Sequence, residues 1–286
     1  MKYKICPVCN CRSFKIKTKL KEDINLCCKC RFSWAVVDNI NNLKVDYDLI
    51  LKSVSSLRTK NFINIITNIL TKIRKHKIKG LEIGSATGLF IELAEQKHIS
   101  MVGIEPMKNS FLEAKKKGLN VINGFFPDDF KNEQKFDFII FNDTLEHIPN
   151  INKIIKECYD RINENGFLII NLPISTGVLY KVASILNVFG ITSFFKRLWQ
   201  FETESPHIYY FNNYNLKILM GKHGFIFNSY VKQDTFVIKG LYDRISVTNK
   251  NKIYSVTVFL LLVIFLPLVN ILPRDINCLF FQKNTK

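Results

Sequence analysis

Residues Leu81–Phe90, which read LEIGSATGLF, decide the fold that we predict. The first three residues end a short apolar stretch typical of a buried strand, and helical spacing of apolar residues follows Gly88. Glycines between a strand and a helix let a ligand approach the backbone, and the N-terminus of the helix then faces that ligand. The glycines are not spaced as Gly-x-Gly-x-x-Gly, so the fingerprint for dinucleotides does not fit.

An acidic residue lies where the next predicted strand ends. This strand closes as Gly103-Ile104-Glu105-Pro106, which places Glu105 seventeen residues after Gly88. A carboxylate at this position can accept hydrogen bonds from both hydroxyls of a ribose. The glycine turn alone is weak evidence, but the turn together with Glu105 indicates a ligand that contains a nucleoside.

The chain around this turn alternates predicted strands and helices over residues 78–173. We expect strands at Gly80–Ile83, Met101–Ile104, Asn120–Ile122, Phe136–Phe141 and Gly166–Asn171. We expect helices at Gly88–Lys97, Lys108–Lys117 and Ile151–Ile162. This alternation predicts a parallel sheet covered on both faces, with its ligand outside the carboxyl ends of the strands.

At this point the sequence resembles the class I S-adenosylmethionine-dependent methyltransferases, over about residues 55–233. The matching pieces are Glu82–Gly88, Glu105, Phe136–Asn142, Leu145–Pro149, Gly166–Ile170 and the segment from Pro206 to Phe225. One departure is Ala86, where the commonest pattern of the family has glycine; one added methyl group is a tolerable change. The resemblance implies an α/β fold with a Rossmann-like, doubly wound sheet of seven strands, the last of them antiparallel.

The resemblance also implies which residues bind the methionine half of S-adenosylmethionine. Gly84, Ala86 and Gly88 would line the methionine moiety. Glu82 would orient the amino group or the loop, and Asn142 would bound the methionine carboxylate and the site of transfer.

The nucleoside half is assigned in the same way. Glu105 would hold the ribose, and Gly124 and Phe125 would lie beside the adenine. For each glycine the alternative is a plain structural turn.

Two histidines compete for the role of a general base. A sulfonium is already a strong methyl donor, so the protein mainly aligns the displacement and excludes water, although a hydroxyl or carbon acceptor benefits from a base. His147 follows Glu146 beside the cofactor loop, and His207 lies in Ser205–Tyr209 on the acceptor side. Either histidine could instead be a packing or capping residue.

The N-terminal residues predict a structural zinc site. Two Cys-x-x-Cys pairs about 17 residues apart fit a four-thiolate site, whose ligands would be Cys6, Cys9, Cys27 and Cys30. Four thiolates leave no open position, so this zinc would hold a small module together and would not be catalytic. Cys11 and Cys28 are spare, although Cys28 could replace Cys27.

An uncharged run of 21 residues, Ile253–Pro273, reaches the length of about 20 residues that a membrane-spanning helix needs. Lys250 and Lys252 precede the run and Arg274 follows it. If a strand near Phe225–Val231 pairs antiparallel with one at Asn277–Gln282 in one sheet, the run between them must leave the sheet and return to it on the same side of a membrane. Pro267 could then break it into a re-entrant hairpin or a helix in the membrane plane.

An amphipathic stretch, Val178–Trp199, could lie against the same surface. The alternative for both stretches is a lid that packs over the acceptor pocket. The domain organisation follows: a zinc-ribbon-like module (1–40), a helical linker or N-terminal helix (45–79), the core (80–233, with a lid-like insertion at about 175–205), a hydrophobic membrane-associating insertion (234–275), and a final strand and tail (276–286).

The net charge of +17 is unevenly distributed. Basic minus acidic residues give 18 − 5 = +13 over 1–79, 10 − 14 = −4 over 80–175 and 13 − 5 = +8 over 176–286. Lysines beside an apolar run fit an anionic membrane surface, although composition bias explains part of the excess. The near-average apolar and charged fractions, 47% and 23%, exclude a disordered or collagen-like chain.

These observations favour methyl transfer from S-adenosylmethionine to a small-molecule, lipid-linked or glycan acceptor at the membrane surface. We expect a cytoplasmic protein at the inner face of the membrane, because no secretory signal opens the sequence and free cysteines suit a reducing compartment. The first alternative is an RNA methyltransferase whose zinc module contacts RNA. Nucleic acid is a less favoured partner, because the basic N-terminal segment, residues 1–79, lacks arginine clusters interleaved with aromatic residues. The second alternative is a non-enzymatic zinc-ribbon interaction protein.

Overall fold

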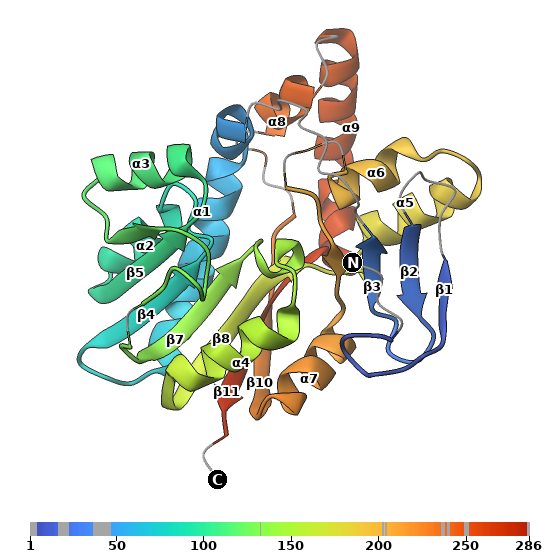
Figure 1. Ribbon diagram of the computed structural model, residues 1–286. Helices are drawn as coiled ribbons and strands as arrows, with labels where there is room; N and C mark the ends of the chain where they lie inside the picture. The colour runs from blue at the N-terminus through green and yellow to red at the C-terminus, as the bar shows by residue number, and fades with distance from the viewer. Residues whose placement is uncertain are drawn as a thin grey trace.

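The computed structural model describes residues 5–16, 23–36, 47–131, 133–201, 203, 205–235, 238, 241–248 and 252–284. These residues form a seven-stranded sheet flanked by helices and a four-stranded sheet beside it (Figure 1). The predicted start of the helical linker at residues 45 and 46, and Lys250 before the apolar run, lie outside the described residues.

The large sheet has the order β10-β11-β8-β7-β4-β5-β6. Its strands are β4 (Ile78–Ile83), β5 (Ile99–Glu105), β6 (Val121–Asn123), β7 (Phe136–Asn142), β8 (Ile162–Pro173), β10 (Phe225–Gln233) and β11 (Ile276–Lys283). Strands β6, β5, β4, β7 and β8 pair in parallel, and β11 pairs antiparallel with both β8 and β10. The predicted doubly wound sheet of seven strands with an antiparallel last strand is confirmed.

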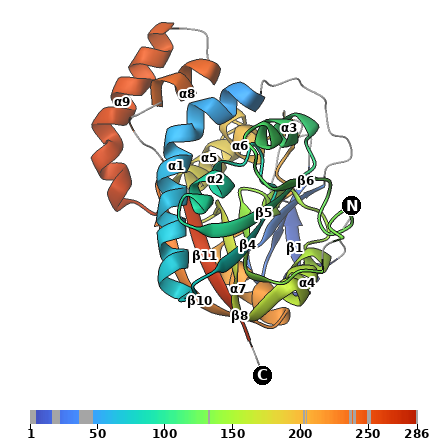
Figure 2. The same ribbon diagram turned by 90° about the vertical axis from the view of Figure 1, so that its left-hand side faces the viewer.

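Helices cover both faces of this sheet, which is why a central strand such as β7 is buried along its whole length. On one face lie α1 (Tyr47–Lys72), α2 (Leu89–Glu95) and α3 (Lys108–Lys116), as Figure 2 shows. On the other lie α4 (Ile151–Arg161), α7 (Asn213–Lys222) and the cysteine-containing module. The cavity described below opens at the carboxyl ends of β4 and β7, and β5, which pairs with β4, ends at Glu105.

The small sheet combines the N-terminal module with a strand from the core. Strands β1 (Phe14–Ile16), β2 (Asp23–Cys27) and β3 (Ser33–Val36) form an antiparallel meander. β3 then pairs with β9 (Tyr209–Tyr210), so that Trp34 lies opposite Tyr209. The other face of this small sheet packs against α5 (Val178–Val188) and α6 (Ser193–Trp199). The module is therefore built into the core.

The C-terminal insertion leaves the sheet after β10 and returns to it as β11, as the topology argument predicts. It consists of α8 (Leu241–Thr248) and α9 (Lys252–Ile271), which project beyond the sheet at the top of Figure 1. Pro267 lies within α9 and does not divide the run into two segments. Among the residues that the structure describes, no helix combines the length and apolarity that a membrane crossing requires.

Candidate functional site

A cavity of about 170 Å³ opens where the carboxyl ends of β4 and β7 meet α1. Four of the residues implied by the resemblance line it: Glu82, Gly84, Ala86 and Asn142. Gly84 has a φ of +74°, and a Cβ there would lie 2.4 Å from Thr144 Cγ2. Glycine at this position therefore lets the loop after β4 pack tightly against the loop after β7.

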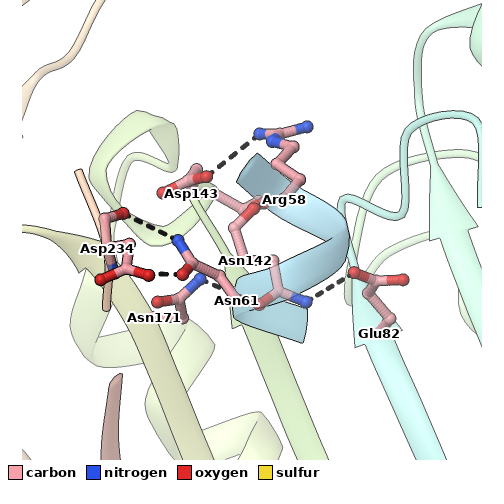
Figure 3. Close-up of polar contacts among 8 residues, drawn as sticks. Arg58, Asn61, Glu82, Asn142, Asp143, Asn171 and Asp234 are labelled. Carbon is pink, nitrogen blue, oxygen red and sulfur yellow. Dashed lines mark hydrogen bonds and ion pairs between the residues drawn. The ribbon is translucent and has the colours of Figure 1, made fainter. Parts of the chain in front are cut away.

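Glu82 carries a free oxygen at this cavity. Asn142 Nδ2 donates to Glu82 Oε1 at 2.8 Å, and Asn171 Nδ2 donates to Asn142 Oδ1 at 3.2 Å (Figure 3). Glu82 Oε2 is buried and has no hydrogen-bond partner within the described part of the chain. Burial raises the pKa of Glu82 to about 8, against the lowering effect of the Asn142 hydrogen bond and the Arg58 charge. Such an orphaned acidic oxygen fits a cationic group of a ligand.

Helix α1 supplies residues of this cavity that the sequence analysis missed. Arg58 and Phe62 line it, and Arg58 pairs with Asp143 at 3.1 Å, as Figure 3 shows. The sequence holds one signal for Arg58, a single arginine one turn before Phe62 on the helix that precedes the glycine loop. This signal is weak, because most such charges face solvent.

Glu105 does not line the cavity, but it accepts a hydrogen bond from Ala86 in the loop that does. Its Oε2 accepts a hydrogen bond from the amide of Ala86, and its Oε1 accepts one from the amide of Met107, each at 2.8 Å. The side chain is buried, and desolvation raises its pKa although the two amides lower it. Each oxygen keeps a further lone pair, so the geometry remains compatible with a ribose.

The other implied residues lie near the cavity without lining it. Gly88 has a φ of +80°, and a Cβ there would lie 2.3 Å from Leu119 Cδ1, so packing alone explains this glycine. The amide of Gly124 donates to the carbonyl of Glu105 at 3.2 Å. The Phe125 side chain is 67% exposed, which leaves an apolar ring available beside the end of β5 and β6.

Ala86 is in the left-handed region, with a φ of +47°. This conformation costs an alanine roughly 1 kcal/mol and glycine almost nothing. We expect Ala86→Gly to keep or raise the free energy of unfolding by up to about 1 kcal/mol, and Ala86→Val to lower it by about 1–2 kcal/mol. Urea denaturation checks both changes; a strongly destabilised glycine variant would contradict the strain argument.

The two predicted histidines lie together beyond the end of β7. Their rings are 4.6 Å apart at 72°, and Glu146 shares the cluster, with ligand atoms of all three residues within 4.8 Å of one another. His147 Nδ1 lies 3.1 Å from the Pro206 carbonyl oxygen and 3.2 Å from Ser205 Oγ. Burial lowers the pKa of both histidines, that of His207 furthest, and burial raises the pKa of Glu146. The sequence motifs identified the two histidines as candidates but not the carboxyl group of Glu146.

The four predicted zinc ligands form a second cluster, in which all sulfur atoms lie within 4.8 Å of one another. Cys6 Sγ is 3.7 Å from Cys30 Sγ, and Cys9 Sγ is 3.5 Å from Cys27 Sγ. A zinc tetrahedron with bonds of about 2.3 Å places its sulfurs about 3.8 Å apart, so this donor set fits zinc. Cys28 is exposed outside the cluster, which favours Cys27 as the ligand.

The two cysteine turns have the same backbone shape. Asn10 and Arg31, the residues after each pair, have φ values of 58° and 60°. Their amides donate back to the carbonyls of Cys6 and Cys27 at 2.9 and 3.1 Å. Both turns thus present two sulfurs to one point.

Comparison with known proteins shows the family to which residues 56–227 belong. Residues 56–227 match the model of a family described as a methyltransferase domain. An uncharacterised protein of Methanocaldococcus jannaschii is 34% identical over 103 residues, which are 35% of this chain and 48% of that protein. A ubiquinone biosynthesis O-methyltransferase of Pelagibacter ubique is 33% identical over 98 residues, which are 32% of this chain and 41% of that protein. The match spans less than half the length of these curated relatives.

Solved structures share the fold at low identity. A magnesium protoporphyrin IX methyltransferase from Synechocystis PCC 6803 with bound S-adenosylhomocysteine is 12% identical with a TM-score of 0.56, covering 85% of this chain and 96% of that chain. A cyclopropane synthase from Mycobacterium tuberculosis is 13% identical with a TM-score of 0.55, covering 77% and 84%.

Proposed function

The chain belongs to the methyltransferase-domain family as a class I S-adenosylmethionine-dependent methyltransferase, and we propose that its acceptor is a small molecule, lipid-linked compound or glycan at a membrane surface. The residues that line the cofactor cavity favour an enzyme over the non-enzymatic interaction protein, and a cofactor titration separates the two. The observation that carries the proposal is an exposed apolar surface on helices. A backbone hydrogen bond joins one of these helices to the segment that contains His207.

We infer that different residues at the cavity bind different parts of the cofactor. S-adenosylmethionine supplies an electrophilic methyl group. Glu82 Oε2 suits its ammonium group, and Arg58 with Asn142 suits its carboxylate. Glu105 would receive the ribose hydroxyls, and Gly84, Ala86 and Gly88 keep side-chain bulk out of the loop. Gly124 and Phe125 would border the adenine.

Glu82 gives this assignment a pH-dependent test. In the unliganded protein its pKa is about 8 instead of the ordinary 4.5, so the unfolded chain ionises first as pH rises. The free energy of unfolding should therefore fall between about pH 4.5 and 8 in the wild type, and fall less in Glu82→Gln. Cofactor affinity should drop at least about tenfold in that variant, which is roughly 1.4 kcal/mol. Calorimetric titration and denaturation at pH 6, 7 and 8 measure both; equal affinities would refute the ammonium assignment.

We propose that His147 and His207 act on the proton of the acceptor. They come from two segments that a backbone bond fixes together, because the amide of Ile208 donates to the Glu146 carbonyl at 2.9 Å. His147 is the partly exposed member and so the one that solvent or an acceptor reaches. A buried imidazole is kept neutral and can accept a proton.

Alanine substitutions test this pair. His147→Ala and His207→Ala should each leave cofactor affinity within about threefold and lower transfer by about 100-fold, the lower end of the usual range for a base. His223→Ala is the matched control, since that histidine contacts Asn152 on α4, outside the cluster. Normal turnover in both cluster variants would remove the histidines from the mechanism.

The apolar surface lies on α5, α6 and the segment between them. Its exposed side chains include Val182, Ile185, Val188, Phe189 and Phe194, and Phe189 is 78% exposed. Contiguous apolar exposure of this kind marks a surface for lipid or protein.

This surface connects to the histidine pair through short contacts. The amide of His207 donates to the carbonyl of Trp199 at the end of α6, at 2.9 Å. Tyr180 of α5 packs against Tyr210, with ring centroids 4.4 Å apart, and Tyr210 packs against His207. A lipid-linked acceptor held at this surface would lie beside the proposed base.

Vesicle binding tests the location. Val188→Ser combined with Phe189→Ser should lose most binding to vesicles of phosphatidylglycerol, and so should deletion of residues 250–275. Leu112→Ser is the control, because Leu112 is exposed on α3, outside the patch. Wild-type protein that stays in the supernatant with these vesicles would contradict membrane association.

Labelled S-adenosylmethionine identifies the acceptor. The proposal expects label in the lipid or glycan fraction of a cell extract. Label in RNA, together with RNA binding that weakens steeply with salt, would favour the RNA methyltransferase instead.

We also infer that Cys6, Cys9, Cys27 and Cys30 hold a structural zinc ion. Their distances and paired turns support this inference. The ion would keep β3 in place beside β9, and through β9 the position of His207.

A further inference from the structure

We propose that Glu146, His147 and His207 form a binding site for one divalent transition-metal ion, separate from the cysteine cluster. Two imidazoles and one carboxylate are a ligand set that first-row divalent metals accept while keeping open positions. The ligand atoms of the three residues lie within 4.8 Å of one another, although no hydrogen bond joins them. The proposal goes beyond the methyl transfer described above and does not depend on which acceptor the enzyme uses.

Unpartnered buried atoms at the centre of the cluster support a missing ligand. Glu146 is 1% exposed, and neither of its carboxyl oxygens has a hydrogen-bond partner among the residues described. His207 is 4% exposed, and its Nδ1 is also without a partner there. Buried polar groups are hydrogen-bonded or bound to an ion in most proteins, so three buried atoms without partners in one cluster require an explanation. A cation satisfies all of them at once.

The surroundings of the cluster fix the ligands as metal sites usually do. His147 Nδ1 is within hydrogen-bond distance of the Pro206 carbonyl, which accepts the proton on that nitrogen and leaves Nε2 free as a ligand. The backbone bond from Ile208 to Glu146 ties the two contributing segments together. Both segments are therefore positioned before any ion binds.

The charges nearby are compatible with a divalent ion. Glu146 would supply one negative charge once an ion displaces its proton, and Asp143 lies close enough to influence it. Arg58, the nearby cation, is paired with Asp143 at 3.1 Å, which limits its repulsion. An ion at this point would occupy the nitrogen lone pairs that otherwise accept a proton, so the histidine pair would act on an acceptor oxygen through the ion.

Manganese binding to the full-length protein tests the proposal, because Mn²⁺ prefers nitrogen and oxygen ligands and leaves a four-thiolate site to zinc. The free Mn²⁺ signal in electron paramagnetic resonance should report one site per chain in the zinc-loaded wild type. Glu146→Gln and His207→Asn should each weaken binding at least tenfold, and His223→Asn should not. No binding in the wild type, or undiminished binding in both cluster variants, would overturn the proposal.

Two further measurements keep the result unambiguous. Cobalt loaded into the cysteine site gives a thiolate absorption band, and its persistence in each variant shows that the fold is intact. If a buried substitution unfolds the protein, His147→Asn at the partly exposed position gives the same comparison. A chain that methylates lipid but binds no manganese refutes the metal site alone, and a chain that binds manganese but methylates no lipid refutes the proposed function alone.

Discussion

Cys30→Ser is expected to abolish methyl transfer while leaving cofactor binding nearly unchanged. Cys30 is fully buried in the cysteine cluster, and its carbonyl is within 3.5 Å of the side-chain amides of Asn212 and Asn215 at the start of α7. Structural zinc in small modules contributes about 10–16 kcal/mol of apparent binding free energy, so the loss of one ligand should unfold the N-terminal module. The cofactor cavity is built from other elements and should persist.

Transfer should suffer because the module supports the segment that carries His207, a proposed base. β3 pairs with β9, and Phe32 packs against Phe211 with ring centroids 5.0 Å apart. Without these contacts the segment that carries His207 loses its position, and a displacement of about 1 Å can lower a rate about 100-fold. Chelation of the metal from the wild type should reproduce the effect.

The measurement is single-turnover transfer together with calorimetric titration of the cofactor. Cys28→Ser is the matched control, since Cys28 is exposed and outside the cluster, and it should behave as the wild type. A Cys30→Ser protein that transfers normally would show that the module does not support the acceptor site.

Glu105→Ala should produce the largest loss of cofactor affinity, about 100-fold or roughly 2.7 kcal/mol. The carboxylate accepts hydrogen bonds from the amides of Ala86 and Met107. Hydrogen bonds to a charged group contribute about 1.5–3 kcal/mol each to stability. Its removal leaves two amides without an acceptor and frees the loop that shapes the cavity. The free energy of unfolding should fall by about 3 kcal/mol.

Denaturation and cofactor titration test this expectation. Glu105→Gln keeps one acceptor oxygen and should give an intermediate result. Glu92→Ala is the control, because Glu92 makes an exposed ion pair with Lys117 and should cost less than about 0.5 kcal/mol. An alanine variant that binds the cofactor normally would show that the loop holds its shape without Glu105.

The sequence could predict the large sheet because its signals are local. Phe136–Asn142 is mostly apolar and is buried throughout, and the return of the chain as β11 followed from the expected antiparallel pair. The cysteine spacing likewise predicted that four sulfurs lie together. That prediction depends on residue type and spacing alone, whereas the antiparallel last strand was implied by the resemblance to the methyltransferases. The sequence named both histidines as candidates but did not predict that their rings lie 4.6 Å apart.

The remaining features depend on contacts between distant segments. β9 has two residues, Tyr209 and Tyr210, and no periodicity distinguishes so short a strand. The roles of Arg58 and Glu146 depend on which neighbours the fold brings to them, Asp143 for the first and the histidines for the second. The left-handed φ of Ala86 is imposed by the loop and contradicts the local preference of alanine.

The pairing of Trp34 with Tyr209 has a consequence for the order of folding. Each cysteine turn can close locally around a metal ion, but joining β3 to β9 requires closure of a very long loop, which is slow and entropically costly. Until the large sheet has formed, β3 remains an open edge that can pair with another chain. Refolding at high protein concentration should therefore lose material to aggregation even when metal is abundant, and rapid assembly of the core should decide the yield.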